Sequence, residues 1–111
     1  MSLDAVFAAL AHPVRRGMVE RLTRAPATVG DLAAPLTMSL PSVVQHLKIL
    51  EDSGLVRSAK TGRVRTCYLE TRGLTGLQHW LAAQRAEWEA RTDRLEEFLL
   101  DKDDTDDGRS T

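Results

Sequence analysis

The chain is short of cysteine, and this excludes several kinds of site. Cys67 is the one cysteine among 111 residues, so neither an intrachain disulfide nor a metal site built from several cysteines can form within one chain. Such sparse cysteine is typical of a reducing compartment, and we expect a cytoplasmic protein. We interpret Cys67 itself as a small apolar strand residue rather than a redox sensor, because nothing around it in the sequence indicates a stabilised thiolate.

Long apolar runs are absent as well. No stretch approaches the ~20 apolar residues of a transmembrane helix, and the N-terminal MSLDAVFAAL has an early Asp and no basic segment, so we expect no membrane association and no signal peptide. The sequence also contains no convincing pairing of a nucleophile with a general base. We therefore predict no catalytic residue, no cofactor and no enzymatic activity.

The net charge is close to zero but unevenly distributed. The whole chain carries −1, whereas residues 1–72 hold ten Lys or Arg and six Asp or Glu, a net of +4, and residues 73–111 hold five and ten, a net of −5. Much of the acidic excess lies in DKDDTDD at 101–107, which has too few apolar residues to fold. We predict one mildly basic domain over 1–100 and a disordered acidic tail over 101–111.

Apolar periodicity and breaking residues predict a mainly helical (α+β) fold. Helices are expected at 3–10, 14–25, 29–34 and 40–53, followed by a long helix from 74 to about 100. The segments LVRSAK and RVRTCYL, on either side of Thr61-Gly62, predict a two-stranded hairpin whose turn uses the positive φ of Gly62. Ser39 should cap the fourth helix, with Pro41 in its first turn, and Gly54 should end it.

The helix predicted over 40–53 has an unusual exposed face. Leu40, Val43, Leu47 and Leu50 share its apolar face, and the opposite face carries Ser42 and Gln45, with His46 at its margin. Short polar side chains of this kind can contact base edges in a major groove, where a bidentate Gln–adenine contact is worth about 1–3 kcal/mol of discrimination. The helix alone is equally consistent with an ordinary solvated helix, and His46 alone with a structural or phosphate-contacting group.

The neighbouring elements favour DNA. A short helix precedes this one, a hairpin with four basic residues follows, and a long apolar helix ends the fold, which is the order of a winged helix-turn-helix with a dimerisation helix. Arg63 and Arg65 occupy alternate positions and suit phosphates or a minor groove, although they could also simply solubilise an edge strand. Arg15 and Arg16 could contact the DNA backbone or pair with acids of the last helix.

Two segments resemble the ArsR family of small bacterial repressors, namely PVRRGMVERL and TVGDLAAPLTMSLPSVVQHLKILEDSGLVRSAKTGRVRTCYL. A third segment is similar to the branch of that family without metal sites, namely LAAQRAEWEARTDRLEEFL. The resemblance implies a homodimeric transcription factor whose base contacts fall at 42–46. Val44 stands where the family often has Ser. Valine there replaces a polar contact with an apolar contact to a thymine methyl. The residues that we predict to contact a double-stranded DNA operator are Ser39, Pro41, Ser42, Val44, Gln45, His46, Lys48, Arg63 and Arg65.

A heptad of apolar residues in the long helix predicts the dimer interface. The residues that we expect there, together with two from the first helix, are Val6, Phe7, Leu77, Leu81, Trp88, Leu95 and Phe98. Two alternatives stay open. One is a metal-responsive repressor, although the helix at 29–34 lacks the family's Cys pair and His79 and Glu87 are too far apart to share an ion within one protomer. The other is a winged-helix module that binds a protein instead of DNA. The sequence indicates no effector.

Overall fold

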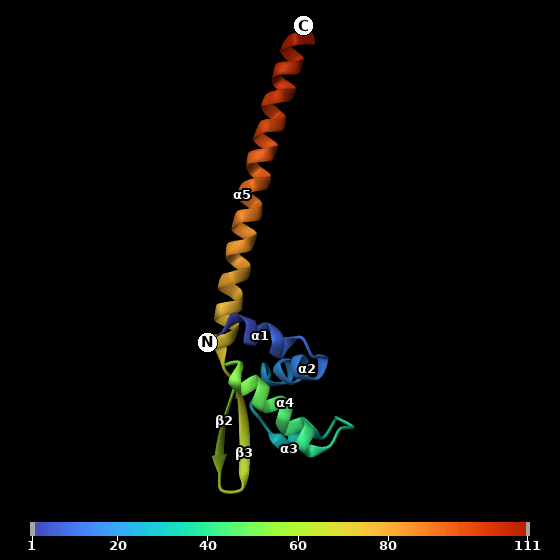
Figure 1. Ribbon diagram of the computed structural model, residues 1–111, viewed down its shortest axis with the longest axis vertical. Helices are drawn as coiled ribbons and strands as arrows, with labels where there is room; N and C mark the ends of the chain where they lie inside the picture. Colours follow the sequence, from blue (N-terminus) through green and yellow to red (C-terminus); the bar gives the residue numbers. More distant parts are fainter. Residues whose placement is uncertain (1, 111) are drawn as a thin grey trace. The chain divides into compact units, whose positions relative to one another are not determined.

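The computed structural model describes the backbone of residues 2–110 and the side chains of residues 2–101. The chain forms two compact units, Met1–Leu77 and Gln78–Thr111. The elements of the first unit are α1 (Leu3–Leu10), α2 (Pro13–Leu22), β1 (Ala27–Thr28), α3 (Val29–Ala33), α4 (Leu40–Asp52), β2 (Val56–Thr61) and β3 (Val64–Leu69), and α5 (Thr71–Ser110) begins there (Figure 1). No helix within the described residues has the length and apolarity needed to cross a membrane.

Side-chain caps explain where the helices of the first unit begin. Thr28 and Asp31 form a reciprocal capping box, in which the Asp31 amide donates to Thr28 Oγ1 (3.0 Å) and the Thr28 amide donates to Asp31 Oδ2 (3.2 Å). Ser39 caps α4, as predicted, and Pro41 lies in its first turn. The sequence did not predict that His12 caps α2 by accepting a hydrogen bond from the amide of Val14 at Nδ1 (3.2 Å).

The end of α4 confirms the role predicted for Gly54. Its φ is 81°, a left-handed conformation that glycine adopts without a Cβ clash. The amide of Gly54 donates to the carbonyl of Glu51 (3.0 Å), and the amide of Leu55 donates to the carbonyl of Leu50 (3.1 Å). These two bonds form a Schellman motif, which satisfies the last carbonyls of the helix and directs the chain into β2.

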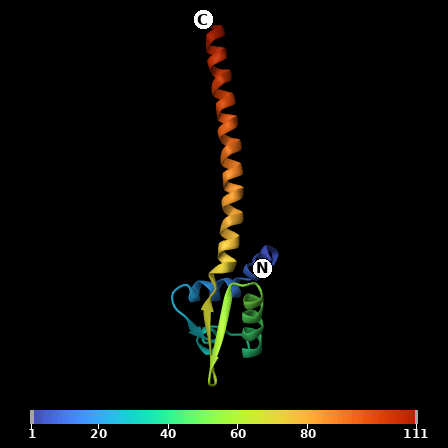
Figure 2. The same ribbon diagram turned by 90° about the vertical axis from the view of Figure 1, so that its left-hand side faces the viewer.

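The sheet has three antiparallel strands in the order β1-β3-β2. The predicted hairpin is confirmed, with Thr61 paired to Val64 across a turn in which Gly62 has a φ of 62° (Figure 2). The strand β1 was not predicted, because it is two residues long and shows no alternation that a sequence pattern could reveal. It pairs Ala27 with Cys67 and thereby attaches the hairpin to the start of α3.

One buried core unites α1, α2, α3, α4 and the sheet. Its buried members are Val6, Ala9, Met18, Val19, Leu22, Ala27, Leu32, Val43, Leu47, Leu50, Leu55, Val56 and Cys67. Three of the four residues predicted on the apolar face of α4 belong to this core. Leu40, on the same face, lies outside the core, since it is 57% exposed. Leu40 is the first residue of α4, and at that end the helix extends beyond the core, which helical periodicity alone does not reveal.

The helix α5 is longer than the predicted 74–100 at both ends, because it runs from Thr71 to Ser110. All described side chains of the second unit, residues 78–101, are exposed. Side chains 102–111 lie outside the described residues. The disordered character of the acidic tail over 101–111 therefore stays a prediction.

Candidate nucleic-acid interface

The first turns of α4 expose the polar face that the sequence predicts. Ser42, Gln45 and Lys48 are exposed, and Pro41 precedes them at the same end of the helix. The hydroxyl of Ser39 is used as the cap, since it accepts from the amide of Ser42 (3.4 Å), and the hydroxyls of Ser39 and Ser42 lie 3.0 Å apart. Gln45 therefore has the freest hydrogen-bonding side chain on this face, with Ser42 tied to the cap of its own helix.

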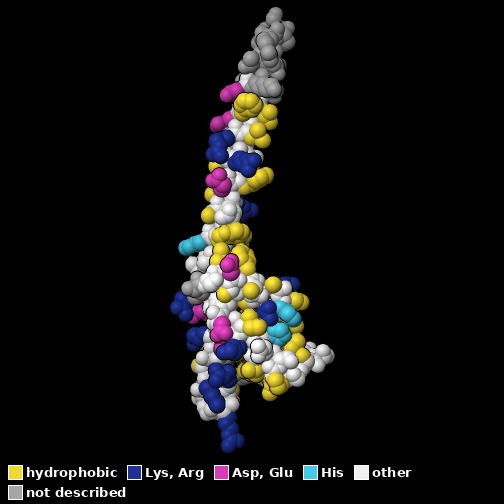
Figure 3. Space-filling view, in the orientation of Figure 1, with side chains coloured by type: hydrophobic (Ala, Val, Ile, Leu, Met, Phe, Trp, Pro, Cys, Tyr) yellow, Lys and Arg dark blue, Asp and Glu magenta, His cyan; other side chains and the backbone are white. Residues whose placement is uncertain are grey.

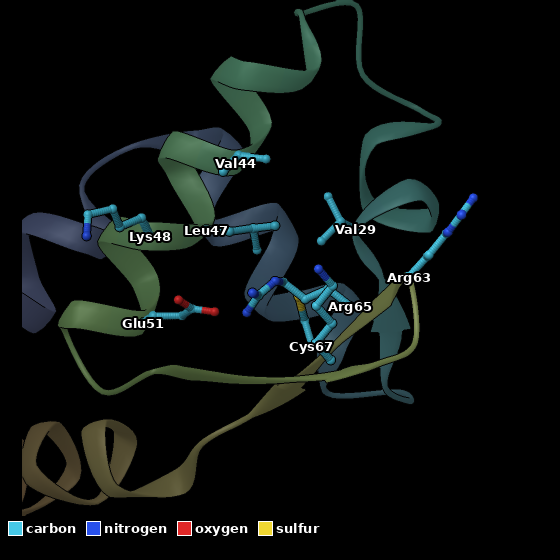
Figure 4. A pocket seen from close by; sticks show the side chains of 9 residues that line it. Val29, Val44, Leu47, Lys48, Glu51, Arg63, Arg65 and Cys67 are labelled. Carbon is cyan, nitrogen blue, oxygen red and sulfur yellow. The ribbon is translucent and has the colours of Figure 1, made fainter.

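A groove of about 430 Å³ separates α4 from the hairpin (Figure 4). Val44, half exposed, and Lys48 line its α4 side, and Lys60, Arg63 and Arg65 line its hairpin side. The groove combines an apolar floor with a basic rim, the lining expected beside a polyanion that also presents methyl groups. The complete set of lining residues is Val29, Val44, Leu47, Lys48, Glu51, Lys60, Arg63, Arg65 and Cys67.

The hairpin places the two predicted arginines in different settings. Arg63 lies in the turn, where it lines the groove with the end of its side chain pointing away from α4, whereas Arg65 lies on β3 beside α4 (Figure 4). Both residues nevertheless line the same groove, so their alternate positions bring them to one side of the hairpin. Lys and Arg side chains gather over the hairpin and at its tip (Figure 3). Arg63 is thus the better placed of the two to reach a phosphate beyond the protein surface.

Arg65 instead helps to attach the hairpin to α4. Its Nη1 donates to the hydroxyl of Ser58 (2.8 Å), and that hydroxyl donates to Oε1 of Glu51. This chain of hydrogen bonds joins both strands to the last turns of the helix. The sequence reasoning missed Glu51 and Ser58, because their meeting depends on where the hairpin folds back. Arg57 stacks on the ring of Tyr68, with its guanidinium carbon 4.3 Å from the ring centroid.

His46 is only partly exposed, in agreement with its predicted place at the margin of this face, and its contact with DNA stays a prediction. Its ring lies 4.6 Å from the ring of His12, centroid to centroid, and its Nδ1 is 3.1 Å from Nη1 of Arg15. Burial lowers the pKa of His46, and the nearby charges of His12 and Arg15 lower it further. Because a guanidinium only donates, Nδ1 accepts this bond, which leaves the ring neutral with its proton on Nε2.

Arg15 and Arg16 also have a structural role that neither predicted alternative described. Arg15 donates through Nε to the carbonyl of Ala9 (2.7 Å) and through Nη2 to that of Ala8 (3.0 Å). Arg16 donates through Nη1 to the carbonyl of Leu10 (2.7 Å). The two arginines thus donate to the last carbonyls of α1, where their charge also interacts favourably with the helix dipole. Through His46, Arg15 joins that end to α4.

The residues predicted for a dimer interface fall into two groups. Leu81, Trp88, Leu95 and Phe98 are exposed on α5, and hydrophobic side chains recur along this helix in Figure 3. Phe7 is 39% exposed and Leu77 is partly buried against the core. Val6 is only 2% exposed and packs inside its own unit, so it has no surface to offer a second protomer and is removed from the prediction.

Cys67 is fully buried and belongs to the core of the first unit. Burial raises the pKa of its thiol, as does the carboxylate of Glu51, while Arg65 acts in the opposite direction. The thiol is therefore protonated at neutral pH, which agrees with an apolar packing role. Among the described residues, no three His, Cys, Asp or Glu side chains come together as metal ligands would.

Comparisons with known proteins agree with this arrangement. Residues 10–59 match the model of a helix-turn-helix domain. The HTH-type transcriptional regulator Rv2034 of Mycobacterium tuberculosis is 43% identical over 77 residues, which cover 69% of this chain and 72% of that protein. The transcriptional repressor SdpR of Bacillus subtilis is 29% identical, over 71% of this chain and 88% of that protein.

Solved structures give the same result. An ArsR family transcriptional regulator, RHA00566, is 50% identical with a TM-score of 0.76, over 78% of this chain and 90% of that one. An ArsR-like transcriptional regulator from Rhodococcus sp. RHA1 is 31% identical with a TM-score of 0.77, over 87% of this chain and 89% of that one. This chain belongs to the ArsR family of winged helix-turn-helix transcriptional regulators.

Proposed function

We propose that this regulator is a cytoplasmic homodimeric repressor that reads a near-palindromic DNA operator with α4 and contacts the backbone with the hairpin. The observation that carries the proposal is the surface on which Gln45 and Val44 are exposed beside a groove rimmed by three basic hairpin residues. Its relatives are named as transcriptional regulators or repressors, which supports a DNA-binding role rather than an enzymatic one.

Each exposed residue has a distinct part in this proposal. Gln45 hydrogen-bonds a base edge, with adenine as the best fit to its amide, and Val44 contacts a thymine methyl. Ser42, Pro41 and Ser39 approach the backbone at the N-terminal end of α4, and Lys48 binds a phosphate. Arg63 contacts the backbone or minor groove at the hairpin tip, while Arg65 holds the hairpin against α4 and lies close enough to the groove to add positive charge.

Two protomers joined through the exposed residues of α5 would present two copies of α4. In a symmetric dimer these address half-sites about 34–36 Å apart, one turn of the duplex, so the operator should be nearly palindromic. Selection of bound duplexes from a random pool, using the full chain, would measure the sequence, symmetry and spacing of the site together. A selected pool without a repeated half-site would contradict the proposal that the protein binds DNA as a dimer.

Substitutions separate base reading from backbone contact. Gln45→Ala should weaken binding to the selected operator by about 1–3 kcal/mol and relax the preference at one position of each half-site. Arg63→Ala should weaken binding to specific and scrambled duplexes alike and lower the salt slope by about one per protomer. Arg94→Ala, which removes the same charge from the second unit, is the control. Gel shifts that show unchanged binding in both Gln45→Ala and Arg63→Ala would refute the proposal.

A further inference from the structure

A second groove lies between α2 and α3, on a part of the first unit that the proposed DNA contacts do not use. Its volume is about 460 Å³, within the range of small-molecule sites. Met18 and Leu32, both buried, form its floor, and Val14 and Leu36, partly buried, flank them. The complete lining is Pro13, Val14, Gly17, Met18, Arg21, Arg24, Asp31, Leu32, Pro35 and Leu36.

Gly17 lines this groove without a side chain. It lies in the interior of α2, where glycine costs about 1 kcal/mol of helix stability relative to alanine. A Cβ at this position would meet no atom within 4 Å, so the absence of a side chain is not required by close packing of the described residues. Its φ is not positive either, so the backbone does not require glycine. What the missing side chain provides is free space above an apolar floor.

The rim of the groove is positively charged. Arg21 uses Nη1 to donate to the carbonyl of Ala25 (3.0 Å), which leaves its other N–H groups for a ligand. Arg24 is exposed, and its guanidinium makes no hydrogen bond or ion pair with the side chains and backbone described. The one acid in the lining, Asp31, already accepts a bond from the amide of Thr28 at the N-terminus of α3. Two guanidinium groups beside an apolar floor complement a carboxylate attached to an apolar body.

We propose that the groove between α2 and α3 binds a small amphipathic carboxylate, with its apolar body on Met18 and Leu32 and its carboxylate on Arg21 and Arg24. Both helices contact α4, because α3 packs on α4 and Met18 of α2 and Leu32 of α3 share the core with Leu47 of α4. A ligand bound between α2 and α3 therefore contacts two helices that support α4. Any consequence for DNA binding rests on the proposed function, whereas ligand binding itself does not.

Calorimetry of the full chain without DNA tests the site. The probes are straight-chain carboxylates from hexanoate to decanoate, each compared with the alcohol of the same length. We expect one carboxylate per protomer and about tenfold weaker binding of the matched alcohol, since charged hydrogen bonds account for the difference. The double variant R21Q/R24Q should lose this preference for the carboxylate, whereas Arg94→Gln should keep it.

Gly17→Leu adds a bulky apolar side chain to the lining of the groove and is the decisive variant. Leucine is a strong helix former and points into open space, so the variant should melt no lower than the parent chain and should bind no carboxylate. Should it bind as tightly as the parent, or should NMR shifts appear on the apolar residues of α5 instead of around Gly17, the proposed site is wrong. The absence of carboxylate binding by the parent chain would overturn it as well, and neither result would affect the DNA-binding proposal.

Discussion

Trp88→Ala should separate the protomers. Trp88 is 66% exposed. Because a fully buried aromatic side chain covers about 150–250 Å², about 100–165 Å² of Trp88 surface remains for a partner to cover. At about 25 cal/mol/Å², burial of that surface contributes about 2–4 kcal/mol per side chain, and a symmetric dimer loses the contribution twice. Even half of the total, about 3 kcal/mol, would raise the dimer dissociation constant more than a hundredfold.

Sedimentation equilibrium over a concentration series of the full chain would measure this constant. The control is Glu97→Ala, because Glu97 lies nine residues further along α5 and therefore on the opposite side of the helix. Far-UV circular dichroism should show an unchanged helical content at high protein concentration, since Trp88 does not belong to the core of the first unit. The reasoning is refuted if Trp88→Ala and the parent chain dissociate at the same concentration.

Two further predictions concern the first unit. Burial and nearby positive charge hold the pKa of His46 below 6.5. The neutral ring therefore makes its full contribution to the free energy of unfolding above pH 6.5, and this contribution is lost as the pH falls below that value. His46→Gln keeps an acceptor for Arg15 but cannot take a proton. Between about pH 7.5 and 5.5, urea denaturation should therefore show a smaller loss of unfolding free energy in this variant than in the parent chain. Equal losses in the two proteins would contradict this role of the contact. Gly73→Ala should lower the free energy of unfolding by about 1–3 kcal/mol, because its Cβ would lie 3.0 Å from the carbonyl oxygen of Gly54. In the same helix, a Cβ at Gly76 meets open space, so Gly76→Ala should raise the free energy of unfolding by up to about 1 kcal/mol. A similar effect of the two substitutions in thermal melts would show that the close approach of Gly73 to Gly54 is unimportant.

Features that depend on a few neighbouring residues could be predicted from the sequence. Ser39 and Thr28 cap their helices through hydrogen bonds to amides three residues away, and Gly54 and Gly62 adopt positive φ where the chain must turn. These interactions are local, so the sequence contains both partners within a single turn. The same holds for the exposure of Gln45, which follows from helical periodicity once the buried side of α4 is known.

Features that depend on distant partners were decided by the tertiary structure. His46 turns toward Arg15, 31 positions earlier, because the end of α1 and the start of α2 lie against α4 there. The bonds from Arg65 through Ser58 to Glu51 exist only after the hairpin folds back on the helix.

The sequence by itself therefore determined the winged helix-turn-helix, its basic hairpin and the polar face of α4, because capping, turn formation and periodicity act over short separations. The tertiary structure alone decided the contacts of the side chains that neighbour this face. It placed the ring of His46 beside His12 and Arg15, bonded Arg65 to Ser58 and left Leu40 exposed, because these outcomes depend on the packing of elements whose contacts no local pattern encodes.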